Sequence, residues 1–219
     1  MLDVGGRGLL KAETERGVCR VLCFDPCHDL TLATMDVPSI RRVVDLWAEQ
    51  TKELGAREDI QYVQVFENRG AMMGASNPHP HGQIWATEHV PMELLAELHT
   101  QRAYFQEHGR TLLADYLELE LQERERLVAE NETWVAVVPF WAVWPFETLL
   151  MPRECASDFD GLSEMNPDGL AAMLKTVTAG YNRVFDTAFS VLDGTSSGAR
   201  GWRYALGMDI ACAFLSAAA

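Results

Sequence analysis

Apolar residues recur along this chain with two different spacings, and each spacing predicts a different secondary structure. Short apolar runs and period-two alternation, which are typical of β-strands, predict strands at residues 18–24, 62–66 and 82–86. Between the first two strands, apolar residues recur every three or four positions and predict an amphipathic helix. Asp36 can cap the start of this helix, Pro38 suits its first turn, and Gly55 can end it.

The second half of the chain repeats this mixture of patterns. Residues 91–126 are helical in pattern and strongly charged, with a break at Gly109, which predicts two surface helices. Three more strands and one amphipathic helix are predicted at residues 127–129, 134–138, 147–151 and 167–185. This order of elements favours an α+β fold with a mainly antiparallel sheet. No pattern continues after residue 189, so we expect the remaining residues to be poorly ordered.

Composition narrows the classes of function. The 219 residues suffice for one large domain or two small ones. Acidic residues outnumber basic ones by 32 to 18, and a net charge of −14 argues against binding nucleic acid or an anionic membrane. No apolar run approaches the about 18 residues of a membrane span, and no signal core follows Met1, so we expect a cytoplasmic protein. Five cysteines, an odd number, fit reduced thiols better than a disulfide scaffold.

The segment with the strongest chemical signal is E-N-R-G-A-M-M-G-A-S-N-P-H-P-H-G-Q-I-W at residues 67–85. Its small residues let backbone approach a ligand and offer N–H donors to an anion. In an extended segment, His79, His81 and Gln83 lie on one face because side chains alternate. A neutral imidazole beside an anion-binding loop can attack phosphorus and divide one displacement into two easier steps.

Other interpretations of these residues remain open on spacing alone. A His-x-His pair also fits a metal pair or two unrelated surface residues, and a Gly/Ser loop is a weak signal for phosphate binding. Cys27, His28 and His79 all have side chains suited to zinc, so they can form part of a zinc site.

The sequence around the two histidines closely resembles the galactose-1-phosphate uridylyltransferase family, of the histidine-triad superfamily. The resemblance rests on F-E-N-R-G-A-M-M-G and S-N-P-H-P-H-G-Q-I-W-A within residues 66–86, on R-G-V-C-R-V at 16–21, and on W-P-F-E-T-L-L-M-P at 144–152. It implies a histidine-triad-like antiparallel sheet with helices. The implied units are a first lobe, connecting helices, an incomplete second lobe and an aberrant, disordered tail, at residues 1–90, 91–126, 127–189 and 190–219.

By position, the resemblance implies that His81 is the nucleophile and that Gln83 holds a phosphoryl oxygen. Residues implied to line the nucleotide phosphate site are Asn68, Gly74, Ala75 and Ser76. The implied reaction is a ping-pong exchange in galactose metabolism. UDP-glucose gives UMP to His81 and releases glucose 1-phosphate, and galactose 1-phosphate then takes up the UMP. The family also implies a homodimer.

The resemblance further implies two metal sites. His28 and His79 match two ligands of a structural zinc, and Glu97 matches one ligand of a second metal ion. The family's other zinc ligands have no counterpart in this sequence, so we expect an incomplete zinc site, with Cys27 as a possible substitute ligand. We expect the second metal site to be lost.

Gln83 separates the branches of the superfamily, because the hydrolases have a third histidine at this position. An amide orients phosphoryl oxygens but cannot transfer a proton at neutral pH. The His-x-His-x-Gln form therefore resembles the transferase and phosphorylase branch, and a dinucleoside polyphosphate phosphorylase is the nearest alternative. A nucleotide-binding remnant with impaired catalysis is the alternative from another class.

The tail carries a separate hypothesis. One set of codons for Ile210 to Ala218, read one base out of frame, gives S-H-A-H-F-Y-P-P, which resembles a strand that the family has in this region. We therefore expect the tail to be a frameshifted form of that strand, and the chain to be a truncated member of the family.

Overall fold

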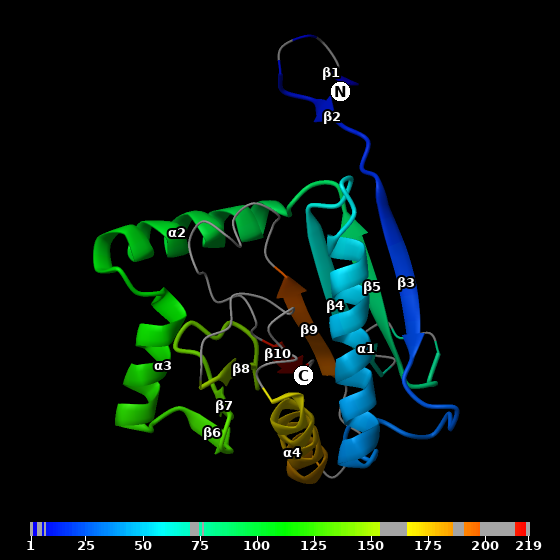
Figure 1. Cartoon of the computed structure of the whole chain (residues 1–219), viewed down its shortest axis with the longest axis vertical. Helices are drawn as coiled ribbons and strands as arrows, with labels where there is room; N and C mark the ends of the chain where they lie inside the picture. The colour runs from blue at the N-terminus through cyan, green and yellow to red at the C-terminus, as the bar shows by residue number, and fades with distance from the viewer. Residues whose placement is uncertain are drawn as a thin grey trace.

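The computed structural model describes residues 2–3, 6, 8–70, 75, 77–153, 166–185, 191–197 and 213–217. Its elements in chain order are β1 (Leu2–Asp3), β2 (Lys11–Ala12), β3 (Gly17–Cys23), α1 (Val37–Gly55), β4 (Tyr62–Arg69), β5 (His81–Thr87), α2 (Met92–His108), α3 (Leu112–Glu123), β6 (Leu127–Glu130), β7 (Trp134–Val137), β8 (Thr148–Pro152), α4 (Pro167–Phe185), β9 (Val191–Ser197) and β10 (Ala213–Ala217). Figure 1 shows β1 and β2 as a small hairpin that projects from the main body.

The main body is built on an eight-stranded sheet with the order β3-β5-β4-β9-β10-β8-β7-β6. Every neighbouring pair in it is antiparallel. The first half of the chain supplies one end of the sheet and the region after α3 supplies the other, with β9 and β10 joining them (Figure 1). The α+β class and the antiparallel sheet are confirmed. The proposed boundaries between lobes stay a prediction.

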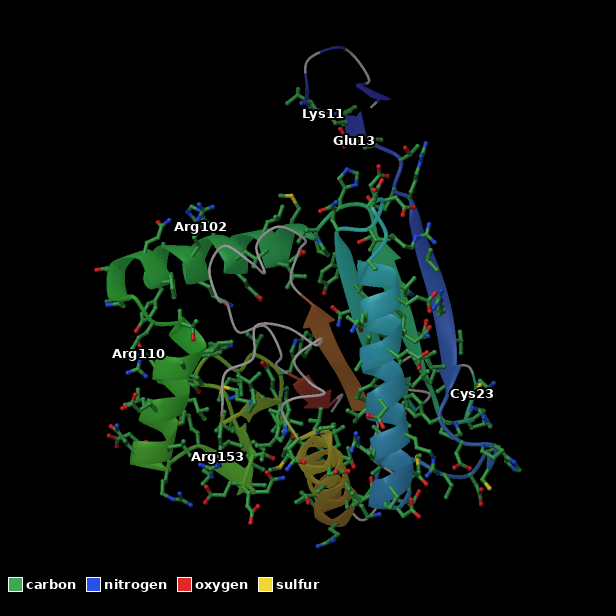
Figure 2. All side chains as sticks on the ribbon, in the orientation of Figure 1. Lys11, Glu13, Cys23, Arg102, Arg110 and Arg153 are labelled. Carbon is green, nitrogen blue, oxygen red and sulfur yellow. The ribbon has the colours of Figure 1, made fainter. Side chains whose placement is uncertain are left out.

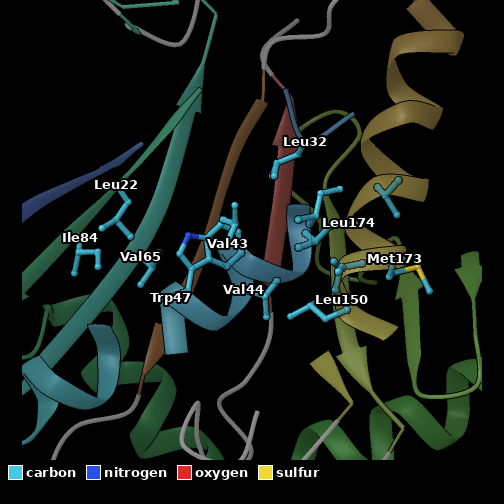
Figure 3. Packing of buried hydrophobic residues seen from close by; sticks show 14 of the residues in the cluster. Leu22, Leu32, Val43, Val44, Trp47, Val65, Ile84, Leu150, Met173 and Leu174 are labelled. Carbon is cyan, nitrogen blue, oxygen red and sulfur yellow. The ribbon is translucent and has the colours of Figure 1, made fainter. Parts of the chain in front are cut away.

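Helices α1 and α4 pack together over one face of this sheet. The N-cap of α1 is Asp36, whose side chain accepts a hydrogen bond from the Ser39 backbone N–H at 2.8 Å, as the sequence predicted. Its buried residues recur every three or four positions, from Ile40 to Leu54. Figure 3 shows Trp47 and its neighbours on α1 meeting strand residues on one side and α4 residues on the other.

Helix α3 covers the opposite face of the sheet, but only at the end formed by β6, β7 and β8. Val135 and Val137 pack with Leu117 of α3, whereas Trp134 and Ala136 of the same strand belong to the core beneath α1 and α4. Helix α2 has no buried residue. At the β3–β5–β4 end, no helix among the described residues covers the face away from α1, and we call this face the open face. No helix within the described parts of the chain is both long and apolar enough to span a bilayer.

The expectation of a disordered tail is wrong for two segments. Val191–Ser197 forms β9 between β4 and β10, and Ala213–Ala217 forms β10 between β9 and β8. Backbone hydrogen bonds to strands distant in sequence hold both segments, whereas Gly and Ser in β9 give a weak local strand signal. The other residues of the predicted tail lie outside the described residues.

Candidate active site

Strand β5 carries the two residues with the strongest chemical assignment. It lies between β3 and β4, with His81 opposite Cys23 of β3 and with Gln83 opposite Phe66 of β4. Residues of β5 alternate between buried positions beneath α1 and half-buried or exposed positions on the open face. His81 and Gln83 are both half-buried on the open face, so the predicted shared face of these two residues is confirmed.

A glycine is required between them. A Cβ atom at Gly82 would lie 2.9 Å from Cζ of Phe24 and 3.3 Å from the carbonyl oxygen of Phe66. The backbone N–H of Phe24 also donates to the carbonyl oxygen of Pro80 at 2.9 Å. The Phe24 ring and this hydrogen bond together fix the start of β5, and hence the backbone from which the His81 side chain projects.

The tautomer of His81 follows from its hydrogen bond. Its Nδ1 atom lies 2.7 Å from the carbonyl oxygen of His79. A carbonyl oxygen only accepts hydrogen bonds, so Nδ1 must carry the proton and donate it. In the neutral ring, the lone pair that can attack an electrophile is therefore on Nε2.

The turn before β5 holds that carbonyl group in place. The backbone N–H of His79 donates to Oδ1 of Asn77 at 3.0 Å, and the following Pro80 is buried. His79 was predicted to share the face of His81 and Gln83 by strand alternation, but it lies in this turn and not in β5, so alternation does not place it there. The backbone carbonyl of His79 thus orients the His81 ring, independently of the His79 side chain.

The predicted phosphate-binding residues are partly described. Asn68 lies on β4, two residues beyond Phe66, which is the last β4 residue paired with β5. The loop that follows begins at Gly70, whose φ of 93° favours glycine. The backbone N–H of Ala75 donates to the Gly70 carbonyl at 3.2 Å, which brings these two described residues together. The other two predicted residues of this loop, Gly74 and Ser76, lie outside the described residues.

The open face also has features that sequence reasoning missed. Phe66 and Trp85 meet edge to face, with ring centroids 5.4 Å apart, beside Gln83. Cys23 is exposed and lies directly across from His81. Both relationships depend on how β5 is aligned with β3 and β4, and local sequence patterns do not indicate this alignment.

The residues implied as metal ligands do not form a metal site among the described residues, where no group of three or more suitable side chains comes together. His28 is exposed in the loop after β3. A hydrogen bond to Asp25 and the charge of that carboxylate raise the pKa of Cys27, which disfavours the thiolate that zinc binds. Glu97 has an exposed side chain on α2, and partial desolvation raises the pKa of its carboxyl group. The described residues thus do not fit a zinc ion.

The fold and the site define a protein of the histidine-triad class, with a His-x-His-x-Gln segment at the start of a strand in an antiparallel sheet. Two family models match the chain: the N-terminal domain of galactose-1-phosphate uridyl transferase at residues 3–91 and its C-terminal domain at residues 97–204. The chain belongs to the galactose-1-phosphate uridyl transferase family.

Curated relatives support this assignment. The chain is 48% identical over 181 residues to the galactose-1-phosphate uridylyltransferase of Rattus norvegicus and 47% identical over 181 residues to that of Haemophilus influenzae. Each alignment covers 83% of this chain but 47% and 51%, respectively, of the relative. The chain therefore spans about half the length of the curated relatives it matches.

Solved structures support the fold. A uridylyltransferase structure has a TM-score of 0.83 at 26% identity and covers 92% of this chain and 64% of that one. An ADP-glucose phosphorylase from Arabidopsis thaliana also has a TM-score of 0.83, at 23% identity, and covers 93% of this chain and 64% of that one. The second likeness supports the fold alone.

Proposed function

We propose that this chain carries the covalent half of a nucleotidyl transfer, with His81 as the nucleophile and UDP-glucose as the donor. The observation that carries the proposal is the 2.7 Å contact between His81 Nδ1 and the His79 carbonyl oxygen. This contact places the proton on Nδ1 and leaves the Nε2 lone pair for attack. Family membership supplies the class of substrate.

In the first step, Nε2 of His81 forms a bond to the α-phosphorus of UDP-glucose. The bond from that phosphorus to the bridging oxygen breaks, and glucose 1-phosphate leaves with the electron pair. The ring then has a substituent on Nε2 and a proton on Nδ1, so it is positively charged. The His79 carbonyl oxygen accepts the hydrogen bond from Nδ1 and stabilises this charge.

In the second step, a phosphate oxygen of galactose 1-phosphate attacks the same phosphorus. The N–P bond breaks, its electron pair returns to Nε2, and UDP-galactose leaves. The side-chain amide of Gln83 orients a phosphoryl oxygen through both steps, and Asn68 assists from β4. Because an amide does not transfer protons at neutral pH, Gln83 does not activate water.

Incubation with UDP-glucose labelled in the α-phosphate tests this proposal. We expect a label on the chain that is labile to acid and stable to base, and that is absent from His81→Ala. The control is His89→Ala, which removes an exposed histidine two residues beyond the far end of β5. Absence of label from the unmodified chain would contradict the covalent step, and label that persists in His81→Ala would contradict the assignment of His81.

The same assay separates the alternatives. Label that moves to galactose 1-phosphate supports the complete transferase, and label that stays on the chain supports a half-reaction. Label from a diadenosine polyphosphate, but not from UDP-glucose, supports a dinucleoside polyphosphate phosphorylase. No label from either donor, with retained nucleotide binding, supports a non-catalytic remnant.

A second copy of the chain is the partner that we propose. The loop from Pro139 to Phe146, here called the aromatic loop, contains no charged residue and exposes 76% of Phe140 and 66% of Trp144. Its backbone is held from within, because Tyr116 accepts from the Phe140 N–H and Tyr181 donates to the Phe146 carbonyl. Glu147, directly after the loop, accepts from the Val143 and Trp144 N–H groups, and the Arg126 guanidinium lies over the Phe140 ring. In a chain with a charge of −14, a fixed surface whose own residues are uncharged limits like-charge contact between two copies.

The oligomeric state in solution tests this contact. We expect Trp144→Glu to shift the chain from dimer to monomer in analytical ultracentrifugation, whereas Met92→Glu, at an exposed position on α2, leaves it dimeric. A monomeric unmodified chain would contradict the proposal.

A cytoplasmic location is also proposed for this chain, and fractionation of the source cells tests it.

A further inference from the structure

Cys23 occupies a specific position beside His81. The two residues are directly paired across β3 and β5, and paired residues in antiparallel strands project from the same face. Cys23 is exposed, and Leu22 before it is buried beneath α1, so the thiol is on the open face with the imidazole. Figure 2 shows Cys23 at the end of β3, at the edge of the sheet.

The type of pairing brings these two side chains close together. The Phe24 N–H donates to the Pro80 carbonyl at 2.9 Å, which marks that pair as hydrogen-bonded. Pairs alternate along an antiparallel ladder, so the next pair, Cys23 and His81, is of the non-hydrogen-bonded kind. Such pairs have Cα atoms about 4.5 Å apart and the closer side chains.

The paired neighbour of His81 is on β3 and not on β4. The pairing of β4 with β5 ends at Phe66 and Gln83, and Asn68 follows two residues further along β4, toward the start of β5. The residue paired with His81 itself is therefore the small thiol on β3. A group that reacts at Nε2 needs space beside the ring, and this small neighbour leaves that space on the β3 side.

We propose that Cys23 forms the β3 side of the His81 site and that its small size determines which groups reach Nε2. This inference rests on the proposed function for its biological meaning, but its geometry is testable without UDP-glucose. Cys19 is the matched control: it is exposed, on the same face of the same strand, and paired with Trp85 four residues along β5 from His81.

The experiment uses full-length chains that retain Cys23 or Cys19 and have serine at the other four cysteines. N-ethylmaleimide caps the remaining thiol, because the thiolate adds to the carbon–carbon double bond and a proton goes to the neighbouring carbon. Diethyl pyrocarbonate then probes His81: Nε2 attacks its carbonyl carbon, an N–C bond forms and ethyl carbonate leaves. Tandem mass spectrometry measures the modification of His81.

We expect the cap on Cys23 to slow the modification of His81 by about tenfold or more, which corresponds to about 1.4 kcal/mol in the barrier. The cap on Cys19 should change it by less than about twofold, less than about 0.5 kcal/mol by the same relation. Equal rates in the two capped chains would overturn the inference. Unfolding raises the accessibility of a half-buried histidine, so protection cannot come from unfolding.

Substitutions give an independent measurement. Cys23→Ser, which keeps the size, should retain uridylylation of His81, whereas Cys23→Phe should lose it and Cys19→Phe should retain it. If uncapped chains show no uridylylation while the cap on Cys23 still protects His81, the proposed function fails and the position of Cys23 stands. If Cys23→Phe is uridylylated as fast as Cys23→Ser, the steric role of Cys23 is wrong.

Discussion

Gly82 and the ring of Phe24 pack so closely that a Cβ at position 82 would lie 2.9 Å from Cζ of the ring. This contact fixes the strand between His81 and Gln83. We expect Gly82→Ala to destabilise the chain by about 1–3 kcal/mol, because an added methyl group forces the ring and backbone apart. Urea unfolding measures the change.

The control for this substitution is Gly180→Ala. Gly180 lies in α4, and a Cβ there meets nothing within 4 Å. Alanine in a helix should stabilise by about 0.5–1 kcal/mol. Equal effects of Gly82→Ala and Gly180→Ala would contradict a tight contact at Phe24.

Gln83→His tests the role given to the amide. A histidine at this position can transfer a proton and bring water to the phosphorus. We expect the variant to release UMP from UDP-glucose by hydrolysis, with transfer to galactose 1-phosphate reduced. Gln83→Met, which keeps the length but has no amide, should lose transfer without gaining hydrolysis. Hydrolysis at the same rate in both variants would show that loss of the amide, and not gain of an imidazole, admits water.

The pair Glu15 and His89 predicts a dependence on pH. Oε2 of Glu15 lies 2.7 Å from Nδ1 of His89, and this hydrogen bond raises the pKa of His89 and lowers that of Glu15. The His89 contribution is complete below its ordinary value of 6.5 and is lost as the pH rises through the raised pKa. The Glu15 contribution is complete above 4.5 and is lost as the pH falls through the lowered pKa.

This contact should therefore be strongest between about pH 4.5 and pH 6.5, the two ordinary pKa values. NMR titration of His89 is the measurement, and Glu15→Gln should move the pKa of His89 down toward its ordinary value. Glu13→Gln is the comparison: its charge raises the same pKa less, so its loss should move the pKa of His89 down by less than the loss of Glu15. An unchanged titration of His89 in Glu15→Gln would contradict the pair.

The buried carboxylate of Glu120 predicts unequal effects for two arginines. Glu120 is fully buried and lies 2.7 Å from Nε of Arg126, whereas Arg124 pairs with the partly exposed Glu130. Removing the partner of a buried charge destabilises far more than removing that of an exposed one. We expect Arg126→Met to lower the melting temperature several-fold more than Arg124→Met. Similar melting temperatures would contradict the larger contribution of the buried pair.

Metal content tests the conclusion that the described residues do not fit zinc. We expect the purified chain to retain well below one zinc per chain after dialysis, because His28 is exposed and Asp25 raises the pKa of Cys27. Elemental analysis by mass spectrometry measures this content. A stoichiometric zinc that His28→Ala removes would contradict this conclusion.

The helices followed from the sequence because each carries its own signal. In α1, buried residues recur at helical spacing and Asp36 caps the first turn, so local pattern and tertiary packing agree. The end of β4 could not be predicted from the sequence. It was predicted to stop at Phe66, but it continues to Arg69 because its polar residues pair with β9. Pairing between distant segments has no local signature.

The features of the site also divide into those that the sequence predicted and those that only the structure shows. The shared face of His81 and Gln83 follows from strand alternation, and the family resemblance named both residues. The hydrogen bond from His81 to the His79 carbonyl and the position of Cys23 across from His81 depend on backbone geometry and register. The sequence alone could not supply either feature, and in the proposed mechanism they determine which nitrogen reacts and how much space it has.

The position of the uridylyl group on the His81 ring tests the central claim most directly. The chain is incubated with UDP-glucose and digested under basic conditions, and the modified histidine is identified by its nitrogen and phosphorus NMR signals. Because Nδ1 donates to the His79 carbonyl oxygen, we predict attachment at Nε2 alone. Attachment at Nδ1, or no attachment to His81, would contradict this account.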